Sequence, residues 1–100
     1  MISEFFPEAI AELEEAFQFY EARAGLGNDF KSEARHALDL VMENPMAWKP
    51  LDGGLRQCRL NRYPYALIYG LDDDRVVVVA VAALKRRPRY WRDRVKRLRR

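Results

Sequence analysis

The chain of 100 residues is 49% hydrophobic and 33% charged, which excludes a disordered polypeptide and predicts one folded domain over residues 1–100. It has no apolar run near the roughly 20 residues of a membrane helix, no signal-peptide start and one cysteine, Cys58, so we expect a cytoplasmic protein without membrane contact, disulfide, metal or cofactor. The net charge of +3 divides into −6 over residues 1–50 and +9 over residues 51–100, and such a field attracts phosphate or acidic protein surfaces.

The first elements predicted along the chain are a strand and a helix. Residues 2–6 form a short strand pattern, and Pro7 suits the first position of a helix, where its missing N–H group is not needed. Helical spacing predicts a core stripe made of Ile10, Leu13, Phe17, Tyr20 and Ala24. Phe19 falls near the edge of the opposite face, and Gly25-Leu26-Gly27 ends the helix.

A second helix follows and completes a predicted helical hairpin. Asn28 or Asp29 can cap its start, and Asn44-Pro45 ends it. Its apolar face consists of Phe30, Ala34, Ala37, Leu38 and Val41. Because each helix has a single apolar stripe, each must pack against another part of the protein.

The second half of the chain predicts three strands, over residues 55–60, 65–71 and 75–83, joined by short turns and therefore antiparallel. The last strand is apolar on both faces, which is typical of a strand in the middle of a sheet. The helical hairpin can cover one face, and the C-terminal segment or a partner protein must cover the other. Residues 90–98 predict a short basic helix. The order β-α-α-β-β-β predicts an α+β fold, with the helical hairpin packed on an antiparallel sheet.

Several short motifs of the chain occur together in one known family. They are Phe6-Pro7-Glu8-Ala9, Phe19-Tyr20, Gly25-Leu26-Gly27, Glu43-Asn44-Pro45, Gly54-Leu55-Arg56, Tyr63-Pro64-Tyr65 and the run from Ala80 to Trp91. In this order they resemble the RelE/ParE superfamily of toxins from type II toxin–antitoxin systems, and most of all its ParE-type members. The resemblance implies a growth-inhibiting toxin, linked to plasmid stabilisation and stress response. It also implies a hetero-oligomer with a cognate acidic antitoxin and DNA gyrase as the target that the toxin inhibits by binding.

The alternative activity within this superfamily is that of a RelE-like endonuclease, which cleaves mRNA on the ribosome. Relatives of that branch typically carry basic side chains at positions that match Gln57, Arg59 and Ala66, and of these only Arg59 is basic here. Many relatives in the superfamily have a histidine at the position of Ala83. RNA cleavage requires a general base, a general acid and cations that stabilise the phosphorane. The nuclease candidates are Arg59, Lys85, Arg86 and Tyr90, in which Tyr90 can donate a proton but a base is missing unless a perturbed Lys85 supplies it. We therefore expect a binding inhibitor rather than an enzyme, with an inactive antitoxin-binding relative as a third hypothesis.

Two sets of binding residues follow from the motifs. The predicted target-binding residues are Lys85, Arg86, Arg87, Tyr90 and Trp91, because aromatic side chains between cations suit either nucleic acid or a protein partner. The predicted antitoxin-binding residues are Phe19, Tyr65, Tyr69 and Arg59, with core packing as the alternative for the two tyrosines. Three other features favour ordinary structural roles: His36 on a solvent face, Cys58 in the core and Asp72–Asp74 in a solvated turn.

Overall fold

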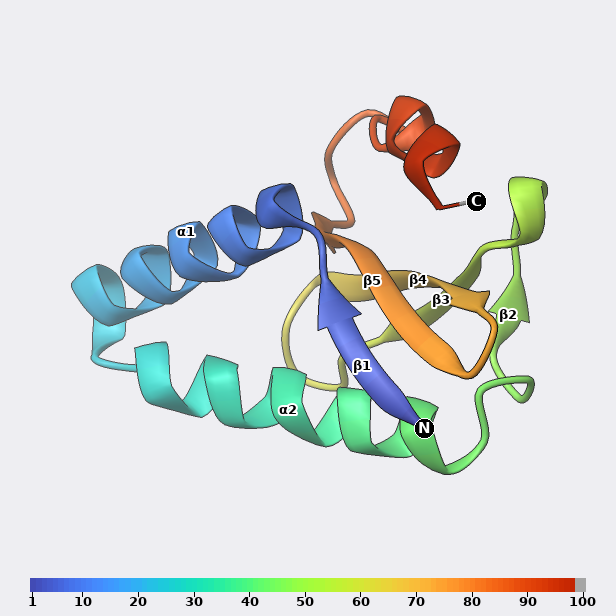
Figure 1. Ribbon diagram of the computed structural model, residues 1–100. Coiled ribbons are helices and arrows are strands. Elements are labelled where there is room, and N and C mark those ends of the chain that lie inside the picture. Colours follow the sequence, from blue (N-terminus) through green and yellow to red (C-terminus); the bar gives the residue numbers. More distant parts are fainter. Residues whose placement is uncertain (99–100) are drawn as a thin grey trace.

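The computed structural model describes residues 1–98 and confirms the α+β fold class. The strands are β1 (Ile2–Phe5), β2 (Lys49–Pro50), β3 (Arg56–Arg59), β4 (Tyr65–Asp72) and β5 (Arg75–Ala83). The helices are α1 (Pro7–Ala24) and α2 (Gly27–Glu43), with 3₁₀ turns η1 (Asp52–Gly54) and η2 (Arg92–Arg97). The helical hairpin lies on one side of the sheet and the C-terminal segment lies on the other (Figure 1). No helix within residues 1–98 has the length and apolar character needed to cross a membrane.

The sheet is mixed, with the strand order β1-β5-β4-β3-β2. Strands β2 to β5 pair in antiparallel fashion, as predicted. The prediction of a wholly antiparallel sheet is wrong at one edge, where β1 runs parallel to β5 and Ile2 pairs with Arg75. Turn residues reveal only the pairing of strands that follow each other in sequence, whereas β1 reaches β5 across most of the chain. The two-residue strand β2 was not predicted, since its Pro50 resembles a loop.

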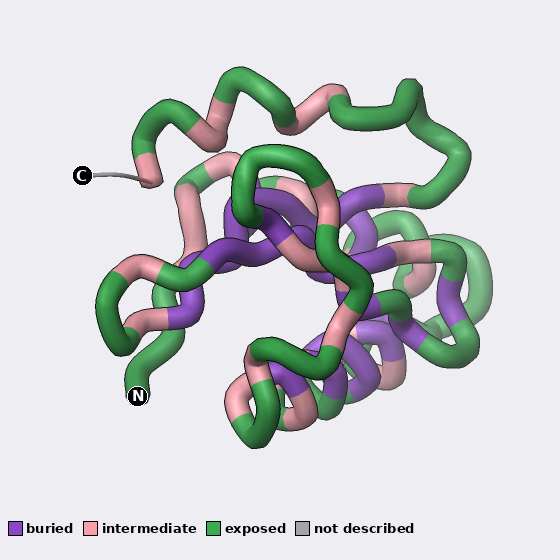
Figure 2. The backbone as a smooth tube through the Cα atoms, turned by 90° about the vertical axis from the view of Figure 1, so that its right-hand side faces the viewer, coloured by how far each residue is buried: buried purple, intermediate pink, exposed green. Residues whose placement is uncertain are grey.

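Strand β5 is an interior strand of the sheet, between β1 and β4, and its observed bounds agree with the prediction. Residues 76–82 are buried on both faces of the sheet. The face toward the helices packs against residues such as Phe30 and Val41. The opposite face packs against Trp91, Val95 and Leu98 of the C-terminal segment, so this chain itself covers the second face. Figure 2 shows the buried sheet between the two layers.

The helices agree with most of the predicted contacts. The predicted face of α2 is confirmed, with Leu38 half-buried and its other members buried. In α1, Ala9 and Ala16 are the buried positions, whereas Ile10 is 55% exposed and Ala24 is exposed. The observed buried face of α1 is therefore rotated from the predicted stripe toward the two alanines. Alanines at this face allow α1 to lie close to the sheet.

The turn between the helices is tighter than predicted. Gly25 adopts a left-handed conformation with φ of 67° and ends α1. Helix α2 then begins at Gly27, so the predicted caps Asn28 and Asp29 lie inside the helix, which has no side-chain cap. A Cβ atom at Gly27 would lie 2.6 Å from the Phe17 ring, and its N–H group donates to the Glu21 carboxylate at 3.1 Å. This close approach explains why the chain re-enters a helix at once.

The C-terminal segment agrees with its prediction in part. A short basic helix is present, but it is a 3₁₀ helix, η2, that covers Arg92–Arg97 and is preceded by turns. The side chains of Val95 and Leu98 are three residues apart and both point to the sheet, which is the spacing that a 3₁₀ turn places on one side. Contact with the sheet therefore selects the tighter turn.

Candidate functional site

A groove runs between α1 and the edge of the sheet where β4 begins and β5 ends. Its volume is about 350 Å³, and we call it the α1 groove. Among its lining residues are Phe19, Tyr65, Lys85, Arg86 and Tyr90. Two of these were predicted to bind the antitoxin and three to bind the target. The fold therefore brings members of both predicted sets to one place.

One wall of the α1 groove is aromatic. Phe19 is 43% exposed and packs edge-on against Tyr20, with 5.0 Å between the ring centroids. Tyr20 in turn contacts Tyr65 and stacks on Phe30 of α2. Burial raises the pKa of Tyr65, so its hydroxyl stays protonated and can donate a hydrogen bond at neutral pH. Because the rings hold each other, Phe19 is presented to solvent from a rigid support.

The other wall is organised by Glu12, a residue that the sequence analysis did not single out. The Glu12 side chain is only 11% exposed. Its carboxylate accepts hydrogen bonds from the Tyr90 hydroxyl at 2.9 Å, from Arg94 at 2.9 and 3.1 Å, and from the Val81 backbone N–H at 3.0 Å. Arg86 lies 4.0 Å away. One carboxylate thus joins α1, β5 and the C-terminal segment.

The network around Glu12 occupies the part of β5 that β1 does not reach, because β1 is the shorter strand. Pairing between β1 and β5 stops at Phe5 and Val78, and the Phe6 N–H then donates to the Val78 carbonyl at 2.9 Å. Beyond this point the backbone of β5 has no neighbouring strand on that side. Arg94 donates to the Val79 carbonyl at 2.9 Å, and Glu12 accepts from the Val81 N–H. The ion pair therefore replaces a missing strand.

Tyr90 is committed to this network. Burial, and then the neighbouring Glu12 carboxylate, raise the pKa of its phenol. The guanidinium of Arg86 lies 3.9 Å from the Tyr90 ring centroid, and that of Arg94 lies 5.3 Å from it. The predicted nuclease residues Arg86 and Tyr90 thus face a carboxylate of their own chain. The one sequence signal for Glu12 is its spacing of four residues from Ala16, on the buried side of α1.

The positions that matter for RNA cleavage lie on the other face of the sheet. Gln57 and Ala66 line a small pocket of about 150 Å³, together with Ala83, Arg86 and Trp91. Arg59 is exposed and pairs across the ladder with Ala66. Lys85 is exposed and lines the α1 groove instead. Of the nuclease candidates, only Arg86 lines this pocket, and its lining includes no carboxylate or imidazole.

The remaining predicted residues fall into two groups. Tyr69 is fully buried, donates its hydroxyl to the Pro45 carbonyl at 2.5 Å, and has a pKa raised to about 12 by burial. It is a core residue, as the alternative of core packing anticipated, so the prediction that it contacts an antitoxin is wrong; regular alternation along β4 places its ring on the helix side with Leu67. Trp91 is half-buried against the sheet, while Arg87 is exposed.

Two predictions of ordinary structural roles are confirmed by burial, and a third is confirmed in part, because Asp72 is the half-buried last residue of β4 and not a turn residue. His36 is exposed on α2. Cys58 is buried, and burial raises the pKa of its thiol to about 11, which leaves little reactive thiolate at neutral pH. Asp73 and Asp74 are exposed in the turn before β5.

Comparisons with known proteins identify a family for this chain and a solved structure of similar fold. The sequence profile of one family, described as the ParE toxin of the type II toxin-antitoxin system, parDE, matches residues 4–98. No curated protein matches the chain. A solved structure described as a chromosomal ParDE TA system from P. aeruginosa is similar to 85% of this chain and 97% of that chain. Its TM-score is 0.67 at 16% sequence identity, so this second likeness concerns the fold.

Proposed function

The chain belongs to the ParE toxin family of type II toxin–antitoxin systems, and from this premise we propose that it inhibits DNA gyrase by binding. We propose further that a cognate acidic antitoxin neutralises it. The target contacts the C-terminal segment from Lys85 to Trp91, and the antitoxin contacts the α1 groove.

The observation that carries the choice of mechanism is the lining of the small pocket on the outer sheet face. Gln57, Ala66 and Ala83 offer neither a general base nor a cation. Removal of one group that stabilises charge in a transition state typically lowers the rate by about 10²–10³-fold. The nearby Arg86 already faces the Glu12 carboxylate. A surface of this kind supports binding and does not support RNA cleavage.

The antitoxin contact is supported by shape and charge. The α1 groove combines the exposed ring of Phe19 with the exposed cation Lys85. Aromatic anchors surrounded by polar groups are the usual centres of protein interfaces. The field of the basic half of the chain adds attraction for an acidic partner. Because the second sheet face is covered by the chain itself, the groove is the more accessible surface for the antitoxin.

The deciding experiment runs two assays with the same purified protein. One contains gyrase and relaxed plasmid, and the other contains translating ribosomes with a defined message. We expect loss of supercoiling activity and an intact message. Prompt cleavage of the message with gyrase unaffected would overturn the proposal in favour of the endonuclease. No effect in either assay would identify a relative that binds its antitoxin alone.

The antitoxin contact has its own test. The product of a short acidic reading frame beside the gene is titrated onto the toxin, and binding is followed by calorimetry and by recovery of gyrase activity. The variant Phe19→Ala tests the α1 groove, and Phe17→Ala is avoided because that ring packs at the helical turn near Gly27. Unchanged affinity for Phe19→Ala would place the antitoxin elsewhere.

A further inference from the structure

The cations of the C-terminal segment divide into two groups. Residues 85–98 contain eight Lys or Arg residues and one acidic residue, Asp93. Four of the eight pair with carboxylates elsewhere in the chain: Arg86 and Arg94 with Glu12, Arg89 with Asp52, and Arg97 with Glu8. Within residues 1–98, no carboxylate lies within 4.0 Å of the other four, which are Lys85, Arg87, Arg92 and Lys96. We call these four the free-cation face.

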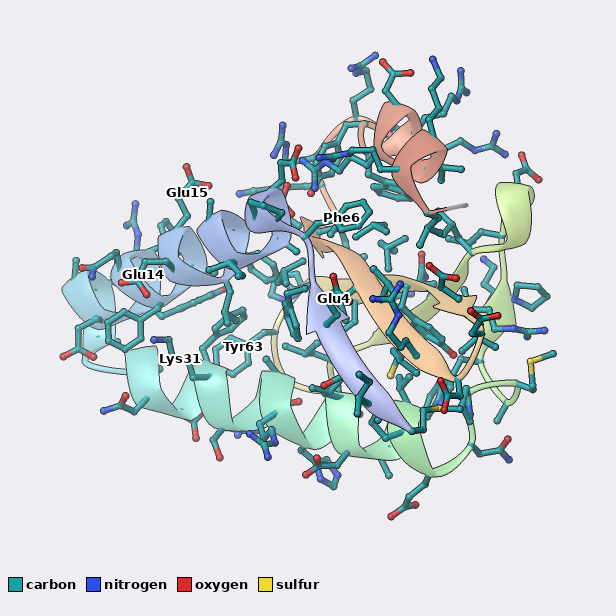
Figure 3. The ribbon with its side chains drawn as sticks, in the orientation of Figure 1. Glu4, Phe6, Glu14, Glu15, Lys31 and Tyr63 are labelled. Atoms are coloured by element: carbon teal, nitrogen blue, oxygen red, sulfur yellow. The ribbon has the colours of Figure 1, made fainter. Side chains whose placement is uncertain are left out.

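All four residues of the free-cation face are exposed. The segment that carries them is held on the sheet by Trp91, Val95 and Leu98, and its paired arginines anchor it to α1 and η1. Several side chains of this segment that end in nitrogen project away from the rest of the molecule at the top of Figure 3. The cations are therefore presented by a fixed support, and no carboxylate of the described residues 1–98 pairs with them.

We propose that the free-cation face binds the phosphodiester backbone of a nucleic-acid duplex directly, without gyrase and without an antitoxin. Exposed lysine and arginine residues gathered in one short segment form the electrostatic footprint that phosphate contacts require. The proposal concerns a ligand of this chain alone, so it stands apart from the choice between gyrase and ribosome as target.

The contacts of the two aromatic residues in this segment, Tyr90 and Trp91, favour a duplex over a single-stranded nucleic acid as the ligand. Single-stranded nucleic acid is usually bound by aromatic rings on which bases stack. Here the Tyr90 hydroxyl is bound to Glu12 and its ring is covered by Arg86, while Trp91 packs on the sheet. Both rings of the segment are thus engaged by their own chain, whereas its four free cations are exposed and can contact phosphates. Binding is thus expected to depend little on sequence.

The same argument sets the expected dependence on salt. Each phosphate neutralised on duplex DNA contributes about −0.9 to the slope of log K against log salt concentration. Four contacts give a slope of about −3.6, so the affinity falls by about 10² between 50 and 200 mM salt. The expected dissociation constant near physiological salt lies at about 10⁻⁴–10⁻⁶ M, as for other binding without sequence preference.

The test measures fluorescence anisotropy of a labelled 20-base-pair DNA duplex titrated with the full purified chain at 50, 100 and 200 mM salt. The variant Arg87→Gln/Arg92→Gln/Lys96→Gln removes three free cations and leaves Lys85 in the α1 groove. The control Arg23→Gln/Lys31→Gln/Arg35→Gln removes three positive charges from the helices, so both variants have the same net charge. Circular dichroism melts check that both are folded.

We expect the first variant to bind at least about tenfold more weakly and to lose about 2.7 from the steepness of the salt slope, while the control binds like the unchanged chain. An RNA duplex of equal length tells whether DNA or RNA is the preferred source of the phosphates. Three results would each overturn the proposal: no binding to either duplex at 50 mM salt, equal losses in both variants, or tighter binding to single strands than to duplexes. Because gyrase is absent from the assay, its outcome is independent of the gyrase result.

Discussion

Replacement of Glu12 by Gln is expected to destabilise this protein more than any other single charge removal in α1. The variant keeps the size of the side chain and one acceptor oxygen, so the Val81 N–H can retain its partner. It removes the negative charge opposite Arg94, whose side chain is only 16% exposed. In the variant, an amide NH₂ group replaces one carboxylate oxygen. A donor then faces the donor group of Tyr90 or Arg94, where the native chain has an acceptor.

The magnitude follows from the burial of both partners. Removal of one partner from a buried ion pair usually costs 3–5 kcal/mol, because the other charge remains without compensation. Since Glu12 and Arg94 are slightly exposed, we expect about 3 kcal/mol, near the lower end of that range. For a domain of this size, each kcal/mol lowers Tm by about 4–8 °C. The expected decrease in Tm is therefore about 12–24 °C.

The assay is urea denaturation followed by circular dichroism, beside a thermal melt. Glu15→Gln is the matched control, since Glu15 lies on the same helix, is exposed, and forms no ion pair within residues 1–98; its effect should stay within about 0.5 kcal/mol. The double variant Glu12→Gln/Arg94→Gln should be less destabilised than the sum of the two single variants. Equal stability of Glu12→Gln and Glu15→Gln would refute the role given to Glu12.

Three further predictions concern single side chains. The pKa of Asp29 is lowered by hydrogen bonds from Arg62 and Tyr63, so its stabilising effect is present above the unfolded pKa of about 3.9 and is lost as pH falls through the lower folded value. Asp29→Asn should therefore flatten the acid limb of a plot of unfolding free energy against pH, and an unchanged limb would contradict this. The buried Cys58 should react with a thiol reagent only after urea unfolding, and rapid labelling of the native chain would contradict its burial. Phe19→Ala should leave Tm within a few degrees, yet weaken antitoxin binding by about 2 kcal/mol or more if the ring is an anchor; calorimetry measures this, and an unchanged affinity would exclude the role.

The sequence by itself determined the elements whose pattern is local. The apolar run in β5 predicted a central strand with its observed bounds, because a strand buried on both faces needs apolar residues at every position. Pro7 and Gly25 marked the two ends of α1, because the missing N–H group and the left-handed φ act within one turn of the chain. The family motifs were likewise readable, since they are short and keep their order.

Only the tertiary structure decided the features that join distant segments. The parallel pairing of β1 with β5, the burial of Tyr69 and the network around Glu12 depend on which segments meet. Glu12 resembles any acidic residue of a surface helix until the end of β1 leaves the β5 backbone without a partner. The division of the basic segment into paired and free cations has the same origin, because Coulomb attraction acts through space and depends on burial. A linear pattern records charge and hydrophobicity, but not the distance between residues 82 positions apart.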